Sequence, residues 1–190
     1  MKSNRLFDLF RAGQGAVAGW MSIDSAYAAE LVGASGFDAV VIDCQHGMAG
    51  HAQMLAMLQA LSHTAAVPLV RVSQNNLAEI NRALDAGAYG VICPMVNTRE
   101  DAQNLVAWTH YAPKGTRSFS PVRAVLYSGA DYAVHANETI VTFAMIETAQ
   151  ALDNLDSILS VEGLDAIYIG PSDLSLSLGC TPTLFFARPV

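Results

Sequence analysis

The most informative segment of the chain is Ile140-Val-Thr-Phe-Ala-Met-Ile-Glu147-Thr148. An apolar, β-branched run followed by an acid and then by a helical pattern predicts a buried strand that ends at a site. A second stretch of the same form, Leu164-Asp-Ala-Ile-Tyr-Ile-Gly-Pro-Ser-Asp173, lies further along the chain. Because neighbouring parallel strands lie about 5 Å apart, we expect Glu147 and Asp173 to emerge side by side at one edge of a sheet.

Length and composition predict one layered α/β domain over residues 1–190. Apolar residues make up 52% of the chain and charged residues 14%, so the sheet should be covered on both faces. No apolar run reaches the roughly 18 residues that span a bilayer. The opening segment from Lys2 to Arg11 carries Asp8 and lacks the apolar region of a signal peptide. We therefore expect a cytoplasmic protein without a membrane partner.

The net charge of −7 argues against nucleic acid as a partner, because nucleic-acid-binding proteins carry basic surfaces. The cysteines Cys44, Cys93 and Cys180 show no zinc-binding or CxxC spacing, and their odd number fits a reducing compartment. The net charge says little about a small anionic substrate, which local Arg residues could hold.

Strand and helix patterns alternate along the chain, which is typical of parallel βαβ units. Residues 111–137, rich in Gly, Ser, Pro and Tyr, are predicted to form an irregular functional excursion. Strands are expected over residues 16–22, 37–43, 67–72, 89–94, 140–146 and 164–170, and helices over 5–12, 26–35, 51–62, 77–86, 98–108 and 149–159.

The residues able to carry chemistry fall at or just after the ends of five predicted strands: Asp43, Arg71, Pro94, Glu147 and Asp173. In a parallel α/β barrel, active sites are built on that face from several strands. An open doubly wound sheet would gather such residues mainly at one switch point. The contribution from five strands favours the barrel.

The turn after the second strand reads Asp43-Cys-Gln-His46 and is a candidate acid/base pair. A carboxylate that fixes the tautomer of an imidazole and supports its charged form suits general acid/base work. The alternative is that Asp43 caps the next helix and His46 packs in the loop.

Arg71 interrupts an apolar strand, so its guanidinium needs an anionic partner. A carboxylate or enolate of a ligand would match its two-pronged donor geometry. A salt bridge to Asp43 or Asp85 would satisfy it equally well.

Glu147 and Asp173 form a candidate metal pair. Two carboxylates with open positions for water and substrate are typical of Mg²⁺ or Mn²⁺ sites. Alternatively, each acid caps the helix that follows, since Thr148 and Ser172 also lie at helix starts. The turn at Gly170 could offer free N–H groups to a substrate carboxylate.

At these residues the chain resembles the HpcH/HpaI aldolase family of class II, metal-dependent pyruvate aldolases. The similarity runs in order from about residue 16 to residue 179. The matching stretches are FDAVVIDCQHG (37–47), VPLVRV (67–72), LDAGA (84–88), VICPMVNT (91–98), MIET (145–148), ALDNLDSIL (151–159) and IYIGPSDLS (167–175).

The resemblance implies a (β/α)8 TIM barrel of the phosphoenolpyruvate/pyruvate type. It also implies a lyase that cleaves 4-hydroxy-2-oxo acids to pyruvate and an aldehyde through a metal-stabilised enolate, as in aromatic catabolism. Relatives are homo-oligomers, and full-length ones are hexamers, so we expect a homo-oligomer here. A citryl- or malyl-CoA lyase on the same barrel is the enzymatic alternative.

The resemblance also implies a role for each candidate residue. Glu147 and Asp173 would bind Mg²⁺ or Mn²⁺, with Co²⁺ as a further candidate. Arg71 would bind the pyruvate oxygens, and His46 with Asp43 would act as the acid/base dyad. Asp85 would either orient Arg71 or make a subunit contact. The residues expected to bind the substrate are Gly170, Pro171, Ser172 and Asp173.

The chain departs from the family pattern at three places. Gln45 stands where many relatives have Glu, and Met145 where many have Gln, so hydrogen bonding beside the site is expected to differ. Residues 183–190 no longer follow the pattern, and a complete barrel takes about 250 residues. We therefore expect a barrel truncated after six βα units, and an inactive fragment is the alternative of another class.

Overall fold

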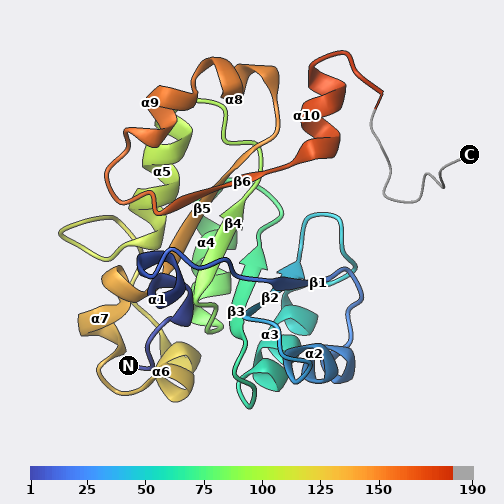
Figure 1. The fold of residues 1–190 in the computed structure, drawn as a ribbon. Coiled ribbons are helices and arrows are strands. Elements are labelled where there is room, and N and C mark those ends of the chain that lie inside the picture. Colours follow the sequence, from blue (N-terminus) through green and yellow to red (C-terminus); the bar gives the residue numbers. More distant parts are fainter. Residues whose placement is uncertain (182–190) are drawn as a thin grey trace, which may run out of the picture.

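Six parallel strands form a single sheet in which the order of the strands follows the sequence (Figure 1). The computed structural model describes residues 1–181. This confirms the predicted parallel α/β architecture built from successive βα units. The strands are β1 (Ala18–Met21), β2 (Ala39–Asp43), β3 (Val67–Arg71), β4 (Gly90–Cys93), β5 (Val141–Ile146) and β6 (Ala166–Ile169).

The helices follow the strands and pack mainly on one face of the sheet. In the part of the chain that the structure describes, none of them has the length and hydrophobicity needed to cross a membrane. They are α1 (Arg5–Arg11), α2 (Ala26–Gly33), α3 (His51–Leu61), α4 (Leu77–Asp85), α5 (Arg99–Thr109), α6 (Val122–Ser128), α7 (Tyr132–Thr139), α8 (Ala149–Asp153), α9 (Leu155–Leu159) and α10 (Pro171–Ser177).

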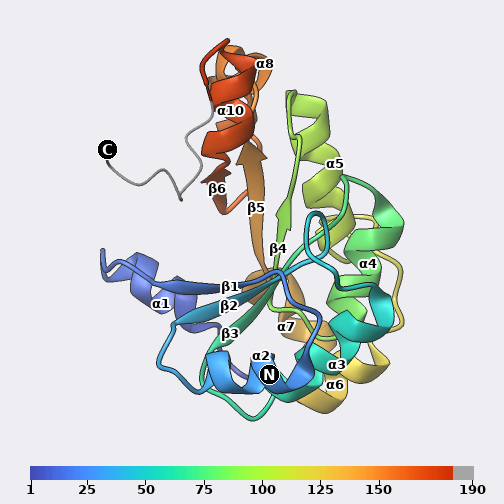
Figure 2. The same ribbon diagram turned by 90° about the vertical axis from the view of Figure 1, so that its right-hand side faces the viewer.

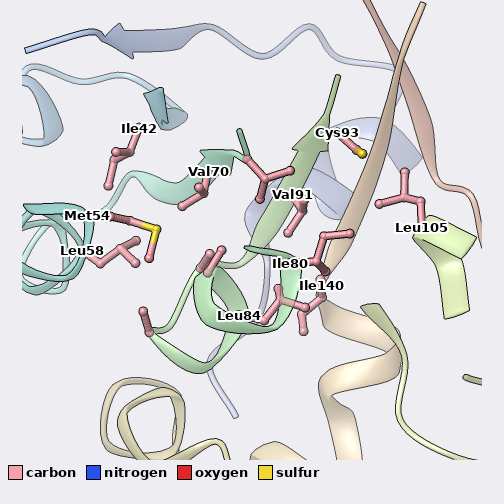
Figure 3. Close-up of a cluster of buried hydrophobic side chains, with 14 of the residues drawn as sticks. Ile42, Met54, Leu58, Val70, Ile80, Leu84, Val91, Cys93, Leu105 and Ile140 are labelled. Carbon is pink, nitrogen blue, oxygen red and sulfur yellow. The ribbon is translucent and has the colours of Figure 1, made fainter. Parts of the chain in front are cut away.

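Strands β2 to β5 are buried on both faces, which explains their near-continuous apolar sequences. Strand β1 alternates between exposed and buried residues and β6 is only half-buried, so the expectation of a sheet covered on both faces holds for the central strands. Side chains that point outward pack against the helices, as Figure 3 shows for Ile42, Val70 and Val91 beside Leu58 and Leu84. Alternate side chains point inward and pack around Leu6 of α1. Helix α1 lies on the opposite side of the sheet from α3 and α4 (Figure 2).

This alternation decides which side chains can reach the inner carboxyl edge of the sheet. In the register of β2 and β3, Asp43 pairs with Arg71, so the last residues of the two strands lie next to each other. On the far side, Ile146 pairs with Ile169, and the Gly170 N–H donates to the Ile146 carbonyl at 3.1 Å. The ends of β5 and β6 are therefore adjacent, as the sequence predicts.

Two expectations about local structure are wrong. The segment 111–137 contains helices α6 and α7 instead of being irregular throughout. The Gly, Ser and Pro residues of this segment give no helical pattern in the sequence. The two short helices are stabilised instead by tertiary contacts of the buried residues Arg117, Ala124 and Tyr132. The single helix expected over 149–159 is broken into α8 and α9, because Asn154 leaves the helical path and its side chain donates to the Asn97 carbonyl at 2.9 Å.

Arg123 on α6 connects the C-terminal ends of two outer helices. Its guanidinium donates to the Leu58 carbonyl of α3 at 3.1 Å and to the Ala86 carbonyl after α4 at 2.6 Å. These carbonyls lie at the negative ends of the helix dipoles, where a cation is favourable.

We expect Arg123→Met to lower the free energy of unfolding by about 1.5–3 kcal/mol, because hydrogen bonds from a charged donor are lost. Urea denaturation measures this change. Arg11→Met, on the exposed end of α1, is the control and should change it by less than about 0.5 kcal/mol. Equal effects of the two substitutions would show that Arg123 does not join the helices.

Candidate functional site

A cavity of about 610 Å³ opens at the carboxyl ends of the strands. Its walls come from β1, β3, β5, β6, the loop after β2 and the start of α10, so the sheet gathers residues that are far apart in sequence. The lining residues are Ala18, Trp20, His46, Arg71, Met145, Tyr168, Gly170, Pro171, Ser172 and Asp173. Most of the predicted site residues thus meet at one place.

Arg71 lines this cavity and forms a buried, two-pronged ion pair with Asp43. Arg71 donates from Nε to Asp43 Oδ1 at 2.9 Å and from Nη2 to Asp43 Oδ2 at 2.5 Å. Burial raises the pKa of the Asp43 carboxyl, but the Arg71 contacts and the backbone N–H groups of His46 and Gln45 outweigh it and lower the pKa to about 2. The salt bridge considered for Arg71 therefore exists, and it fixes the guanidinium at the edge of the cavity.

The expected contact between the Asp43 carboxylate and the His46 ring is wrong. The carboxylate instead accepts from the backbone N–H groups of Gln45 at 3.0 Å and of His46 at 3.1 Å. The physical reason is proximity, because a turn that begins at Asp43 brings the next N–H groups onto its own side chain. His46 is exposed and lines the cavity. Its catalytic role stays a prediction.

Two aromatic side chains of the site were not named from the sequence. The Trp20 ring lies 4.9 Å from the Arg71 guanidinium carbon, and its Nε1 donates to Asp43 Oδ2 at 3.3 Å. Tyr168 lies across the cavity, with its ring 5.4 Å from that of Trp20. Strand alternation could have identified both residues from the sequence, because they occupy inward-pointing positions near the carboxyl ends of β1 and β6.

Glu147 is buried directly after β5, with 1% of its surface exposed. Its Oε1 accepts from the Met95 N–H at 2.7 Å, while Oε2 has no hydrogen-bond partner among residues 1–181. Burial, and then the negative charge of Asp173, raise the pKa of this carboxyl against the opposing effects of the Met95 N–H and the nearby Arg71 and His46. A buried carboxylate with a free oxygen requires a partner.

Neither acid of the predicted metal pair is the N-cap of its helix. Thr148 caps α8 by accepting from the Ala151 N–H at 3.0 Å, so Glu147 is free of that role. Asp173 lies in the first turn of α10, after the cap position at Gly170. The alternative explanation of both acids as helix caps is therefore wrong.

The donors present fit a hard dication with few protein ligands. Within residues 1–181, no group of three His, Cys, Asp or Glu side chains is arranged to hold a metal. A Mg²⁺-type site needs only one or two carboxylates, because water and substrate oxygens complete the coordination. The free Oε2 of Glu147 fits that requirement, and Asp173 is near enough for its charge to raise the Glu147 pKa. The assignment of the two acids as ligands remains a prediction.

Gly170 keeps the space beside this free oxygen open. A Cβ at this position would lie 2.7 Å from Glu147 Oε2 and 2.8 Å from Met145 Cε. Its φ of −95° is ordinary, so the requirement for glycine is one of space.

We expect Gly170→Ala to weaken Mn²⁺ binding by at least about tenfold, because the added methyl group displaces the Glu147 carboxylate (about 1.4 kcal/mol). Calorimetric titration of the metal measures the change. Gly15→Ala is the control, because a Cβ there meets no atom within 4 Å. Unchanged Mn²⁺ affinity in Gly170→Ala would show that a Cβ at this position does not displace the Glu147 carboxylate.

Asp85 does not orient Arg71, so that expectation is wrong. It accepts from Arg117 Nη2 at 2.8 Å, and the Arg117 side chain is fully buried. The reason is topological, because α4 runs back from the carboxyl edge of the sheet and its last residue lies at the opposite edge. A subunit contact by Asp85 stays a prediction.

Comparison with known proteins agrees with the geometry. Residues 17–185 match the family model described as HpcH/HpaI aldolase/citrate lyase. A hydroxypyruvate/pyruvate aldolase from Rhizorhabdus wittichii is 46% identical over 179 residues, which are 94% of this chain and 71% of the relative. A 4-hydroxy-2-oxo-heptane-1,7-dioate aldolase from Salmonella dublin is 37% identical and is matched over 93% of this chain and 68% of its own.

A solved structure has the same arrangement of strands and helices. It is that of an HpcH/HpaI aldolase/citrate lyase family protein from Burkholderia cenocepacia, which is 30% identical and superposes with a TM-score of 0.88. The match covers 97% of this chain and 76% of that protein. Sequence, site geometry and fold agree, and the chain belongs to the HpcH/HpaI aldolase/citrate lyase family.

Proposed function

We propose that this chain is a metal-dependent aldolase, a carbon–carbon lyase that cleaves 4-hydroxy-2-oxo acids to pyruvate and an aldehyde. The observation that carries the proposal is the buried Oε2 of Glu147, which has no hydrogen-bond partner within residues 1–181. It lies against Gly170, at the wall of a cavity that Asp173, Arg71 and His46 line. The relatives named as aldolases support the same reaction class.

We assign Glu147 and Asp173 as the ligands of Mg²⁺ or Mn²⁺, with Co²⁺ as a further candidate. When bound, the cation would withdraw charge from the 2-oxo group and the carboxylate of the substrate. Asp173 is exposed and lines the cavity, so substrate oxygens can reach it.

Arg71 supplies positive charge where negative charge develops on the substrate. Its hydrogen bonds in the described structure use Nε and Nη2 for Asp43, which leaves Nη1 for an oxygen of the substrate. A donor that is already fixed costs no reorganisation during the reaction. The backbone at Gly170, Pro171 and Ser172 lies along the same cavity and would contact the substrate carboxylate.

His46 is the proposed base. It removes the proton of the 4-hydroxyl group, and the O–H electron pair forms the carbonyl of the leaving aldehyde as the C3–C4 bond breaks. The C3–C4 electron pair forms a C2=C3 double bond, and the π pair of the 2-oxo group moves onto its oxygen. A proton is then delivered to C3, which completes pyruvate. The Asp43 carboxylate acts here through the backbone of the turn and through Arg71, because both of its oxygens are engaged there.

The remaining features of the proposal follow from family membership. The six βα units would belong to a (β/α)8 barrel of the phosphoenolpyruvate/pyruvate type, in one domain. We also propose a homo-oligomer in the cytoplasm, with an oxo acid and an aldehyde as its small-molecule partners.

The decisive experiment is pyruvate release from 4-hydroxy-2-oxoheptanedioate, measured by coupling to lactate dehydrogenase, with and without EDTA. We expect turnover that EDTA abolishes and Mg²⁺ or Mn²⁺ restores. Turnover that resists EDTA would contradict the metal assignment. Folded protein without turnover would identify an inactive fragment, and cleavage of citryl- or malyl-CoA alone would identify the other lyase of this family.

A further inference from the structure

We propose that Met95 is a positioning residue for the metal site, acting through the geometry of its backbone. Its left-handed conformation directs the Met95 N–H at one oxygen of Glu147, so that the other oxygen is presented to the cation. The inference rests on the proposed function, because it assumes that Glu147 is a metal ligand.

The conformation of Met95 is unusual. Its φ is 57°, and among residues 1–181 it is the only residue other than glycine with a positive φ. Left-handed backbone is unfavourable for a residue with a Cβ, and such strain persists only where the surroundings impose it. Strain of this kind is concentrated at functional sites.

In this conformation the backbone of Met95 makes a short hydrogen bond to Glu147. The Met95 N–H donates to Glu147 Oε1 at 2.7 Å, across the ends of β4 and β5. In the described structure this bond leaves Oε2 without a partner. The N–H therefore selects which oxygen of a fully buried carboxylate remains available.

The side chain of Met95 does not explain the strain, since it is 48% exposed. The loop around it is anchored instead. The Asn97 N–H donates to Asp101 at 3.0 Å, the Asn97 carbonyl accepts from Asn154 at 2.9 Å, and the side chains of Asn97 and Thr148 are hydrogen bonded. Thr148 directly follows Glu147. The loop that contains Met95 and Asn97 is therefore hydrogen bonded both to the Glu147 carboxylate and to the residue after it.

The test compares substitutions that differ in their tolerance of positive φ. Met95→Gly removes the conformational penalty and keeps the N–H, whereas Met95→Val adds a β-branched side chain that disfavours the left-handed region. Met48→Val is the matched control, because Met48 is an exposed methionine in a loop without positive φ.

The first readout is the Mn²⁺ dissociation constant of the folded protein. We expect Met95→Val to weaken Mn²⁺ binding by about tenfold (about 1.4 kcal/mol). Met95→Gly and Met48→Val should stay within about twofold of the original affinity. A merely structural role would lower the unfolding temperature of Met95→Val without changing the metal affinity of the molecules that remain folded, and that result would overturn the proposal.

The second readout needs no metal and separates this inference from the proposed function. Hydrogen exchange of the Met95 amide in the metal-free protein should be slower by at least about tenfold than in Glu147→Ala, where the acceptor is lost. Equal exchange rates would overturn the positioning role. Protection of this amide in a protein that binds no Mn²⁺ would leave the hydrogen bond in place and refute the metal assignment instead.

Discussion

Glu147→Gln is expected to abolish metal-dependent turnover and to raise the thermal stability of the metal-free protein. The amide cannot supply the anionic oxygen that a hard dication requires, so Mn²⁺ affinity and aldolase activity should fall by about 10² or more. At the same time a buried charge with a raised pKa is removed. We expect the unfolding temperature to rise by about 2–4 °C, the shift that ~1 kcal/mol produces in a chain of this size.

Metal titration and thermal unfolding of the same samples test both parts of this prediction. Glu138→Gln on α7 is the control, since Glu138 is exposed and does not line the cavity. Its metal affinity and unfolding temperature should match those of the unchanged protein. Retained Mn²⁺ binding in Glu147→Gln would remove Glu147 from the ligand set.

The pH dependence of the metal-free protein follows from the same carboxyl group. Because the pKa of Glu147 is raised in the folded state, the folded state holds this proton more tightly than the unfolded state. The contribution of Glu147 to stability is therefore present at low pH and is lost as pH rises from the ordinary carboxyl range through the raised pKa. Comparing urea denaturation of the original protein and Glu147→Gln across this range isolates the effect, and Mn²⁺ should remove it.

Arg71 is the second position where a large effect is expected. Arg71→Lys keeps the charge but loses the paired contact to Asp43, so kcat/KM should fall by about 10²–10³. Arg71→Met leaves the Asp43 carboxylate buried and unpaired, which should cost about 3–5 kcal/mol of stability. Adding Asp43→Asn to Arg71→Met removes that charge and should restore most of the stability without restoring activity.

Initial rates of pyruvate release and urea denaturation measure these changes. Arg82→Lys, at an exposed position on α4, is the control and should leave both unchanged. If Arg71→Met and the double variant were equally unstable, the ion pair would not be the source of the loss. Acid unfolding gives a further check, because the Asp43 contribution should disappear as pH falls from about 4 toward 2.

Local patterns in the sequence were sufficient to predict the strands, because β2 to β5 are buried on both faces and therefore have continuous apolar sequences. The predictions for β5, β6 and the turn after Ile169 agree with the structure to within one or two residues. The capping box of α5, in which Thr98 and Asp101 bond each other's backbone, was also predictable, since both partners lie within one turn. Helices α6 and α7 were missed because contacts distant in sequence stabilise them.

At the site, the residue types at the carboxyl ends of the strands could be predicted from the sequence, because they depend on strand length and alternation. How these residues pair could be learned only from the folded arrangement of strands and helices. In the structure, the Asp43 carboxylate pairs with Arg71, and Asp85 pairs with Arg117. The Met95 N–H donates to Glu147. These contacts join residues on separate strands and helices, and their distances depend on sheet register and loop path, which no local pattern encodes.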